Sequence, residues 1–128
     1  MKKIIQTDNA PKAVGPYSQA VRVGDFLFCS GMIPIDPKTQ EVYLGDIKLQ
    51  TELVMSNLEG QLRSTGLNFA DIVKTTIFLT SMSDFAAVNE VYAKRFTSEP
   101  PARSTVQVAA LPKGVNVEIE VIANFAAQ

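Results

Sequence analysis

The spacing of apolar residues changes from a two-residue to a helical period in the middle of the chain, and this change constrains the fold most. Residues 48–65 carry an apolar stripe at the three- and four-residue spacing of a helix: Leu49, Leu53, Val54, Met55, Leu58 and Leu62. Asp46 is a suitable N-cap for this helix and Gly66 is suitable for its C-terminal end. The sequence therefore predicts one long helix between extended segments.

Extended segments precede this helix. Two apolar runs, residues 20–23 and 26–29, flank Gly24-Asp25, which is typical of a tight β-hairpin because glycine supplies the positive φ of the turn. An additional strand is expected at residues 3–6.

After the helix, residues 72–80 are rich in β-branched residues and predict a strand. A second helix is expected to begin at Ser83 or Asp84 and to end before Pro100-Pro101, because proline disfavours helix in the preceding residue. Its apolar face would carry Phe85, Val88, Tyr92 and Phe96.

Two strands, at about residues 103–108 and 117–125, would close the chain. The order predicts a single α+β domain over residues 1–128, with a mixed β-sheet and both helices packed on one face.

Composition excludes several kinds of active site. The chain has no histidine, which removes the Ser-His-Asp triad, the Cys-His pair and the HExxH zinc site. It contains neither a P-loop nor a GxGxxG motif after a strand. Acid–base chemistry would have to come from carboxylates, a tyrosine, a lysine or water, and we expect no metal site.

Charge and cysteine content suggest where the protein acts. The formal net charge of −1 comes without a basic stripe, so we expect no nucleic-acid partner. The single cysteine, Cys29, cannot form an internal disulfide and lies in an apolar run, where a small core residue is expected. No signal-peptide core or membrane-length apolar run is present, so we expect a cytoplasmic protein without a membrane partner.

Charged residues gather on the last two predicted strands. Because strand side chains alternate, Arg103 and Thr105 share one face, and Glu118 and Glu120 share one face of the next strand. The connecting loop at residues 111–114 suggests antiparallel neighbours, which would bring the arginine and the glutamates onto one polar face. On this pattern alone, a solvated cross-strand ion pair is favoured over a site, because ionisable residues also cluster in structural networks.

Two loops before the first predicted helix add candidates. Gly15-Pro16-Tyr17 offers an aromatic hydroxyl, and Ser30-Gly31 offers a glycine that allows close approach. A packing role for Tyr17 and a plain turn or bulge at Gly31 explain these residues equally well.

Together these segments resemble the RidA/YjgF family over essentially the whole chain, in order. The resemblance rests on Gly15-Pro16-Tyr17-Ser18-Gln19, Ser30-Gly31-Met32-Ile33-Pro34, Asp71 to Thr76, Asp84-Phe85 with Asn89, Pro101-Ala102-Arg103-Ser104, and Leu111-Pro112-Lys113 with Glu118-Ile119-Glu120. It implies a chorismate-mutase-like (YjgF-like) fold that assembles as a homotrimer, with sites between subunits.

The resemblance also implies an activity: cofactor-independent hydrolysis of 2-aminoacrylate/2-iminopropanoate and 2-iminobutanoate to 2-keto acids and ammonia, which protects against metabolite damage. Arg103 would bind the substrate carboxylate and Glu118 would handle the water. Tyr17, Ser30 and Gly31 would line the pocket, and Asn89 would lie near it. Thr105 stands where many relatives have cysteine, and we expect it to contribute its backbone and small size.

Two other functions remain open at this point. A non-catalytic module that binds and senses 2-keto acids would use the same arginine. Ribonuclease activity has been attached to the family name, but the acidic pI and the missing histidine argue against it.

Overall fold

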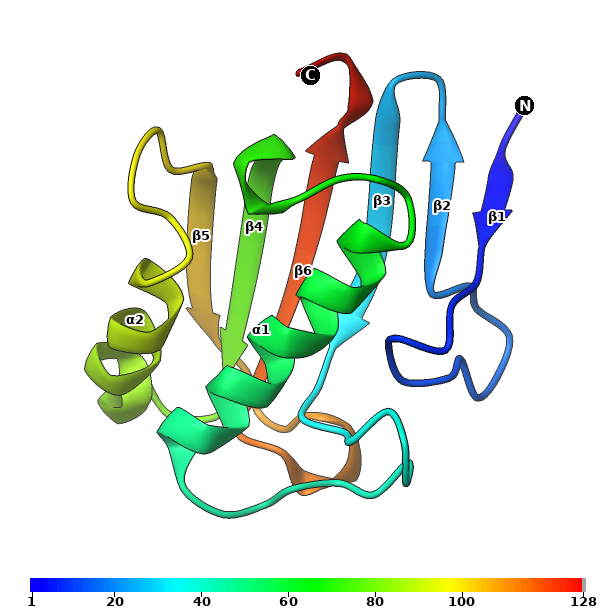
Figure 1. The fold of residues 1–128 in the computed structure, drawn as a ribbon. Helices are drawn as coiled ribbons and strands as arrows, with labels where there is room; N and C mark the ends of the chain where they lie inside the picture. The colour runs from blue at the N-terminus through cyan, green and yellow to red at the C-terminus, as the bar shows by residue number, and fades with distance from the viewer. Residues whose placement is uncertain (128) are drawn as a thin grey trace.

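A six-stranded mixed sheet carries two helices on one face in the computed structural model, which describes residues 1–127 (Figure 1). The elements in chain order are β1 (Lys3–Ile5), β2 (Ala20–Val23), β3 (Phe26–Met32), α1 (Ile47–Arg63), β4 (Ile72–Leu79), α2 (Phe85–Ala93), β5 (Ala102–Gln107) and β6 (Val117–Asn124). This is the predicted order of strands and helices, and the predicted α+β class is confirmed.

The strand order β1-β2-β3-β6-β4-β5 corrects one prediction. β5 and β6 are not neighbours, because β4 lies between them, antiparallel to β6 and parallel to β5. The physical reason is the connection through α2: a strand that follows a crossover helix returns parallel to the strand before the helix. β6 then inserts between β3 and β4, the two strands that α1 connects.

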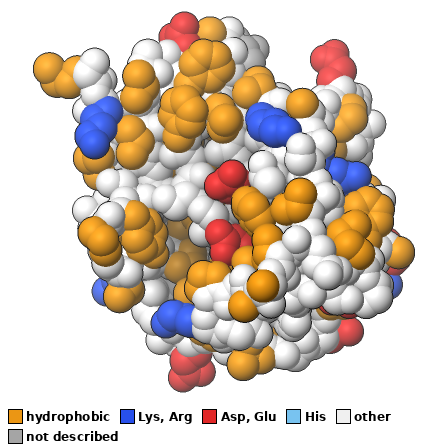
Figure 2. Space-filling view, turned by 180° about the vertical axis from the view of Figure 1, so that it is seen from behind, with side chains coloured by type: hydrophobic (Ala, Val, Ile, Leu, Met, Phe, Trp, Pro, Cys, Tyr) orange, Lys and Arg blue, Asp and Glu red, His pale blue; other side chains and the backbone are white. Residues whose placement is uncertain are grey.

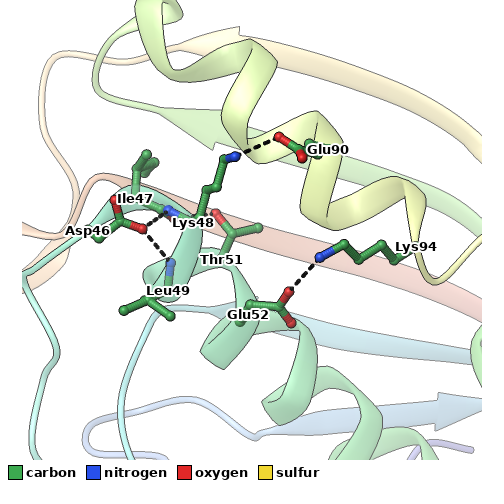
Figure 3. Close-up of polar contacts among 8 residues, drawn as sticks. All are labelled: Asp46, Ile47, Lys48, Leu49, Thr51, Glu52, Glu90 and Lys94. Carbon is green, nitrogen blue, oxygen red and sulfur yellow. Dashed lines mark hydrogen bonds and ion pairs between the residues drawn. The ribbon is translucent and has the colours of Figure 1, made fainter.

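Helix α1 begins as the sequence predicts. Asp46 Oδ2 accepts hydrogen bonds from the backbone N–H groups of Lys48 at 3.0 Å and Leu49 at 3.1 Å (Figure 3). Past its C-terminal end, Gly66 adopts a φ of 82°, which favours glycine.

Two ion pairs join α1 to α2 on the outer surface (Figure 3). Lys48 Nζ lies 2.7 Å from Glu90 Oε2, and Lys94 Nζ lies 3.5 Å from Glu52 Oε1. These side chains are largely exposed, so solvent screens the charges and each pair adds little to the stability of the fold. The helices are held to the sheet mainly by their apolar faces.

The core lies between the helices and the sheet. Leu58 and Leu62 of α1 are buried there, as are Cys29, Ile119 and Val121 from the sheet. Leu49, assigned to the apolar stripe from its spacing, is instead 56% exposed, because it lies in the first turn, away from the sheet.

Helix α2 starts slightly differently from the prediction. Ser83 and Asp84 belong to a 3₁₀ turn that the side chain of Ser81 caps, and Asp84 makes no side-chain cap bond. The predicted apolar face of the helix is present, with Val88 and Tyr92 buried.

The second face of the sheet carries no helix, and we call it the open face. Apolar side chains on this face are 42% to 51% exposed: Ile4, Val23, Phe26, Phe28 and Val106. Because strand residues alternate, Glu118 and Glu120 of β6 also point to this face, whereas Val117, Ile119 and Val121 point to the core. Among residues 1–127, no helix is both long and apolar enough to cross a membrane.

Candidate active site

A hollow of about 630 Å³ lies on the open face, at the N-terminal end of β6, where Glu118 is located. Its lining includes five residues that the sequence singled out, four of them polar: Tyr17, Ser30, Gly31, Glu118 and Glu120. The rest of the wall is largely apolar, from residues such as Val14, Met32 and Ile33. Figure 2 shows this face with acidic side chains in a central hollow, surrounded by hydrophobic side chains.

Glu118 has the properties expected of a proton acceptor. Its side chain is half-buried, and its carboxylate lies against Gly31 of β3. Burial raises the pKa of Glu118, and the neighbouring charge of Glu120 raises it further. A carboxylate with a raised pKa is a stronger base than one in water, which suits it to taking a proton from an attacking water.

A loop from Thr7 to Gln19 forms one wall of the hollow, and the buried side chain of Gln19 holds it together. Gln19 Oε1 accepts from the N–H of Thr7 at 2.7 Å, and Gln19 Nε2 donates to the carbonyl oxygens of Thr7 at 3.0 Å and Pro11 at 2.7 Å. A longer contact of 3.4 Å reaches the carbonyl of Ala10. One amide therefore links three points of a loop that has no regular secondary structure of its own.

Ser30 attaches the same loop to the sheet. Its hydroxyl donates to the carbonyl oxygen of Ser18 at 2.6 Å, and its N–H donates to the carbonyl of Gln19 at 2.9 Å. Tyr17 Oη accepts from the N–H of Val14 at 3.3 Å, and the ring is 52% exposed. Within residues 1–127 the Tyr17 hydroxyl donates to no other group, so its hydrogen can bond a ligand in the hollow.

Arg103 lies on the opposite face of the sheet from Glu118. It is level with Thr75 on β4 and Val121 on β6, both of which face the core. The guanidinium donates from Nη1 to Asn89 Oδ1 of α2 at 2.6 Å. It also lies 5.2 Å from the ring centroid of Tyr92, a cation–π arrangement.

Thr105 shares this helix-side face of β5 with Arg103. Its hydroxyl oxygen is buried and has no hydrogen-bond partner within residues 1–127. Arg103 and Asn89 are thus in direct contact, and Thr105 lies two residues further along the same face of the edge strand.

The structure therefore divides the predicted site residues into two groups. Tyr17, Ser30, Gly31 and Glu118 line one hollow, whereas Arg103, Asn89 and Thr105 lie on the far side of the sheet. The prediction that Arg103 and the glutamates share one polar face is wrong, because β4 separates β5 from β6 and the register turns Arg103 toward α2. No ion pair joins Arg103 to either glutamate in residues 1–127, so a cross-strand ion pair is not present.

Sequence reasoning did not assign a role to Gln19 or to Lys113, which also lines the hollow. A signal for Gln19 was available: it is a polar residue directly before a strand, two positions after Tyr17 in the Gly15–Gln19 segment. Nothing in the spacing identified Lys113.

The sequence and the fold are similar to those of known proteins. The family described as Endoribonuclease L-PSP matches residues 7–125. Protein DfrA of Myxococcus xanthus is 56% identical over 124 residues, which cover 95% of each chain. The chloroplastic Reactive Intermediate Deaminase A of Arabidopsis thaliana is 44% identical over 124 residues, 97% of this chain and 66% of that protein.

A solved structure agrees with these similarities. Escherichia coli TdcF with bound serine superimposes with a TM-score of 0.90 at 46% identity, covering 95% of this chain and 98% of that one. The chain belongs to the RidA/YjgF family, and the predicted family resemblance is confirmed.

Proposed function

We propose that the protein hydrolyses 2-imino acids, with 2-iminopropanoate and 2-iminobutanoate as substrates, to 2-keto acids and ammonia. The observation that carries the proposal is the half-buried Glu118 carboxylate in a largely apolar hollow, with its pKa raised by burial and by Glu120. The relative named Reactive Intermediate Deaminase A and the serine-bound TdcF structure support a substrate that resembles an amino acid.

The reaction needs one anchor and one base. The planar guanidinium of Arg103 binds the substrate carboxylate through two parallel hydrogen bonds, each worth roughly 1.5–3 kcal/mol. This contact fixes the position of C2, the electrophilic carbon of the C=N bond. Asn89 holds the guanidinium in place through its 2.6 Å bond.

Glu118 accepts a proton from water as the water oxygen bonds to C2. The C=N electron pair moves to nitrogen, and the protonated Glu118 returns the proton to that nitrogen, which gives the carbinolamine. The Glu118 carboxylate then takes the hydroxyl proton of the carbinolamine and passes it to the amine nitrogen as the C–N bond breaks, which releases ammonia and leaves the 2-keto acid. A positioned base of this kind accelerates a reaction by about 10²–10⁴-fold. Tyr17 donates a hydrogen bond to the bound substrate.

Arg103 and Glu118 can act on one substrate only if they come from two copies of the chain. Each lies on its own face of the sheet, and the open face presents exposed apolar side chains that a second copy would cover. We therefore propose a homotrimer in which the β5 edge of one subunit meets the hollow of the next. Such a head-to-tail contact closes into a ring, and each site takes Arg103 from one subunit and Glu118 from its neighbour.

Mixed oligomers test this arrangement directly. Arg103→Ala and Glu118→Gln are each expected to be inactive alone. If equal amounts are refolded together at random, about one quarter of the sites combine both native residues, and activity should return to about that level. Mixing without any recovery, while both variants remain folded and oligomeric, would show that the two residues do not share a site between subunits.

Turnover itself is tested by coupling the protein to a threonine dehydratase and following the loss of imine. The expected result is faster 2-ketobutyrate formation that depends on Glu118. Binding of 2-ketobutyrate without any acceleration would instead favour a non-catalytic module that senses small carboxylates.

A further inference from the structure

The β3 strand is irregular where it passes Glu120. Cys29 pairs with Val121 and Met32 pairs with Ile119, so Ser30 and Gly31 together stand opposite the single residue Glu120. This two-against-one pairing is a β-bulge, a feature that often re-aims side chains beside active sites. Because Cys29 and Met32 both face the core, both residues of the bulge are available to the open face.

Each residue of the bulge meets a different part of the hollow. Ser30 uses its hydroxyl to hold the carbonyl of Ser18, as described above. Gly31 occupies the position against which the Glu118 side chain lies. A Cβ added at Gly31 would lie 2.7 Å from Glu118 Cδ and 3.0 Å from Glu118 Cγ, and closest of all to Oε2. Real Cβ atoms essentially never approach another atom to less than 3.0 Å.

We propose that Gly31 is a positioning residue for the reaction: its missing side chain, presented by the bulge, leaves the space in which the Glu118 carboxylate is held. This inference deepens the proposed function and rests on it for its kinetic consequence. The requirement for glycine is steric, because Gly31 does not have the positive φ that sets Gly15, Gly24, Gly66 and Gly114 apart.

A methyl group at this position would displace the carboxylate and leave the fold intact. The atoms in conflict belong to the far end of a flexible side chain that faces solvent on one side, so the glutamate moves before the backbone does. Glu118 would turn outward, away from its half-buried position, and the attacking water would lose its base.

Kinetics of Gly31→Ala provide the first test, with Glu118→Ala as the matched background. Alanine has no atom beyond Cβ, so it leaves the space beside residue 31 empty. We expect Gly31→Ala to lower kcat by about 10²-fold in the native background and to change the residual kcat by less than about 3-fold in the Glu118→Ala background. Equal losses in both backgrounds would overturn the proposal.

A titration of the Glu118 carboxyl carbon by NMR provides the second test and needs no activity. Once the carboxylate moves into water, the pKa of Glu118 should fall toward the ordinary glutamate value in Gly31→Ala, with an unchanged melting temperature. An unchanged titration midpoint would overturn the proposal even if the protein proves to be a deaminase. A shifted midpoint in a protein without deaminase activity would keep the positioning role and reject the reaction.

Discussion

Arg103 and Glu118 are carried on opposite faces of one sheet, with Arg103 toward α2 and Glu118 in the hollow of the open face. The register explains this separation, because Arg103 is level with the core residue Val121, whereas Glu118 alternates with the core residues Val117 and Ile119. If Arg103 binds the substrate carboxylate and Glu118 activates the water, the two residues must come from different subunits. The proposed mechanism therefore requires an oligomer.

Replacement of Arg103 by lysine tests the anchor. Lysine keeps the positive charge but loses the two-pronged geometry, so kcat/KM should fall by about 10–100-fold while the fold is retained. Steady-state kinetics and far-UV circular dichroism measure the two effects.

Arg22→Lys is the matched control, because the Arg22 guanidinium lies over the Phe125 ring at 3.7 Å and does not line the hollow. Near-native kcat/KM in Arg103→Lys would remove Arg103 from the anchoring role.

Replacement of Glu118 by glutamine tests the raised pKa through stability. A carboxyl group whose pKa is higher in the folded state destabilises that state once it ionises, so native stability falls as pH rises from the unfolded pKa of about 4.3 through the folded pKa. Glu118→Gln lacks this loss. Its stability relative to the native protein should therefore be higher at pH 7.5 than at pH 4, as measured by denaturant unfolding. Parallel pH profiles for the two proteins would contradict the raised pKa.

Replacement of Gln19 by glutamate tests the loop that walls the hollow. The carboxylate is nearly the same size but faces the carbonyl oxygens of Thr7 and Pro11 without a donor, so stability should fall by about 1–3 kcal/mol. Amide hydrogen exchange should also speed up in residues 7–17. The exposed Gln6→Glu adds the same charge nearby and should change stability by less than about 0.5 kcal/mol. Equal effects of the two substitutions would mean that the Gln19 amide does not hold the loop.

Burial of Cys29 predicts a protein that is insensitive to thiol reagents. Burial raises the pKa of Cys29 to about 12, so very little thiolate forms at pH 8. Iodoacetamide should leave the folded protein unmodified and fully active, and should react readily after unfolding in guanidinium. Cys29 is the single cysteine of the sequence, so rapid inactivation of the folded protein by iodoacetamide would have to come through Cys29 and would contradict its burial.

Local sequence patterns predicted most of the secondary structure, because each element depends on its own residues. The hairpin at Gly24-Asp25 and the N-cap at Asp46 require only local hydrogen bonds and backbone angles, and both are present. Leu49 was assigned to the buried stripe because its spacing fits the stripe. Spacing does not show whether another part of the protein packs against the first turn of the helix, and there Leu49 stays exposed.

The arrangement of the candidate site residues was predicted only in part. Tyr17, Ser30, Gly31 and Glu118 were all identified, and the structure brings them together in one hollow. The placement of Arg103 and the glutamates on one face within a single chain was wrong, since it assumed that strands adjacent in sequence are adjacent in the sheet. Gln19 was given no role because its importance lies in hydrogen bonds between its side chain and the backbone 8 to 12 residues away, which the periodicity of apolar residues does not report.

By itself, the sequence determined the kinds of element, the classes of chemistry that a chain without histidine excludes, and a family resemblance that comparison confirms. Only the tertiary structure decided that β4 separates Arg103 from Glu118 and that a bulge sets Gly31 beneath the carboxylate. The physical reason is that strand order and register depend on crossover connections and on the packing of the whole sheet, whereas periodicity reports only which face of each strand is buried.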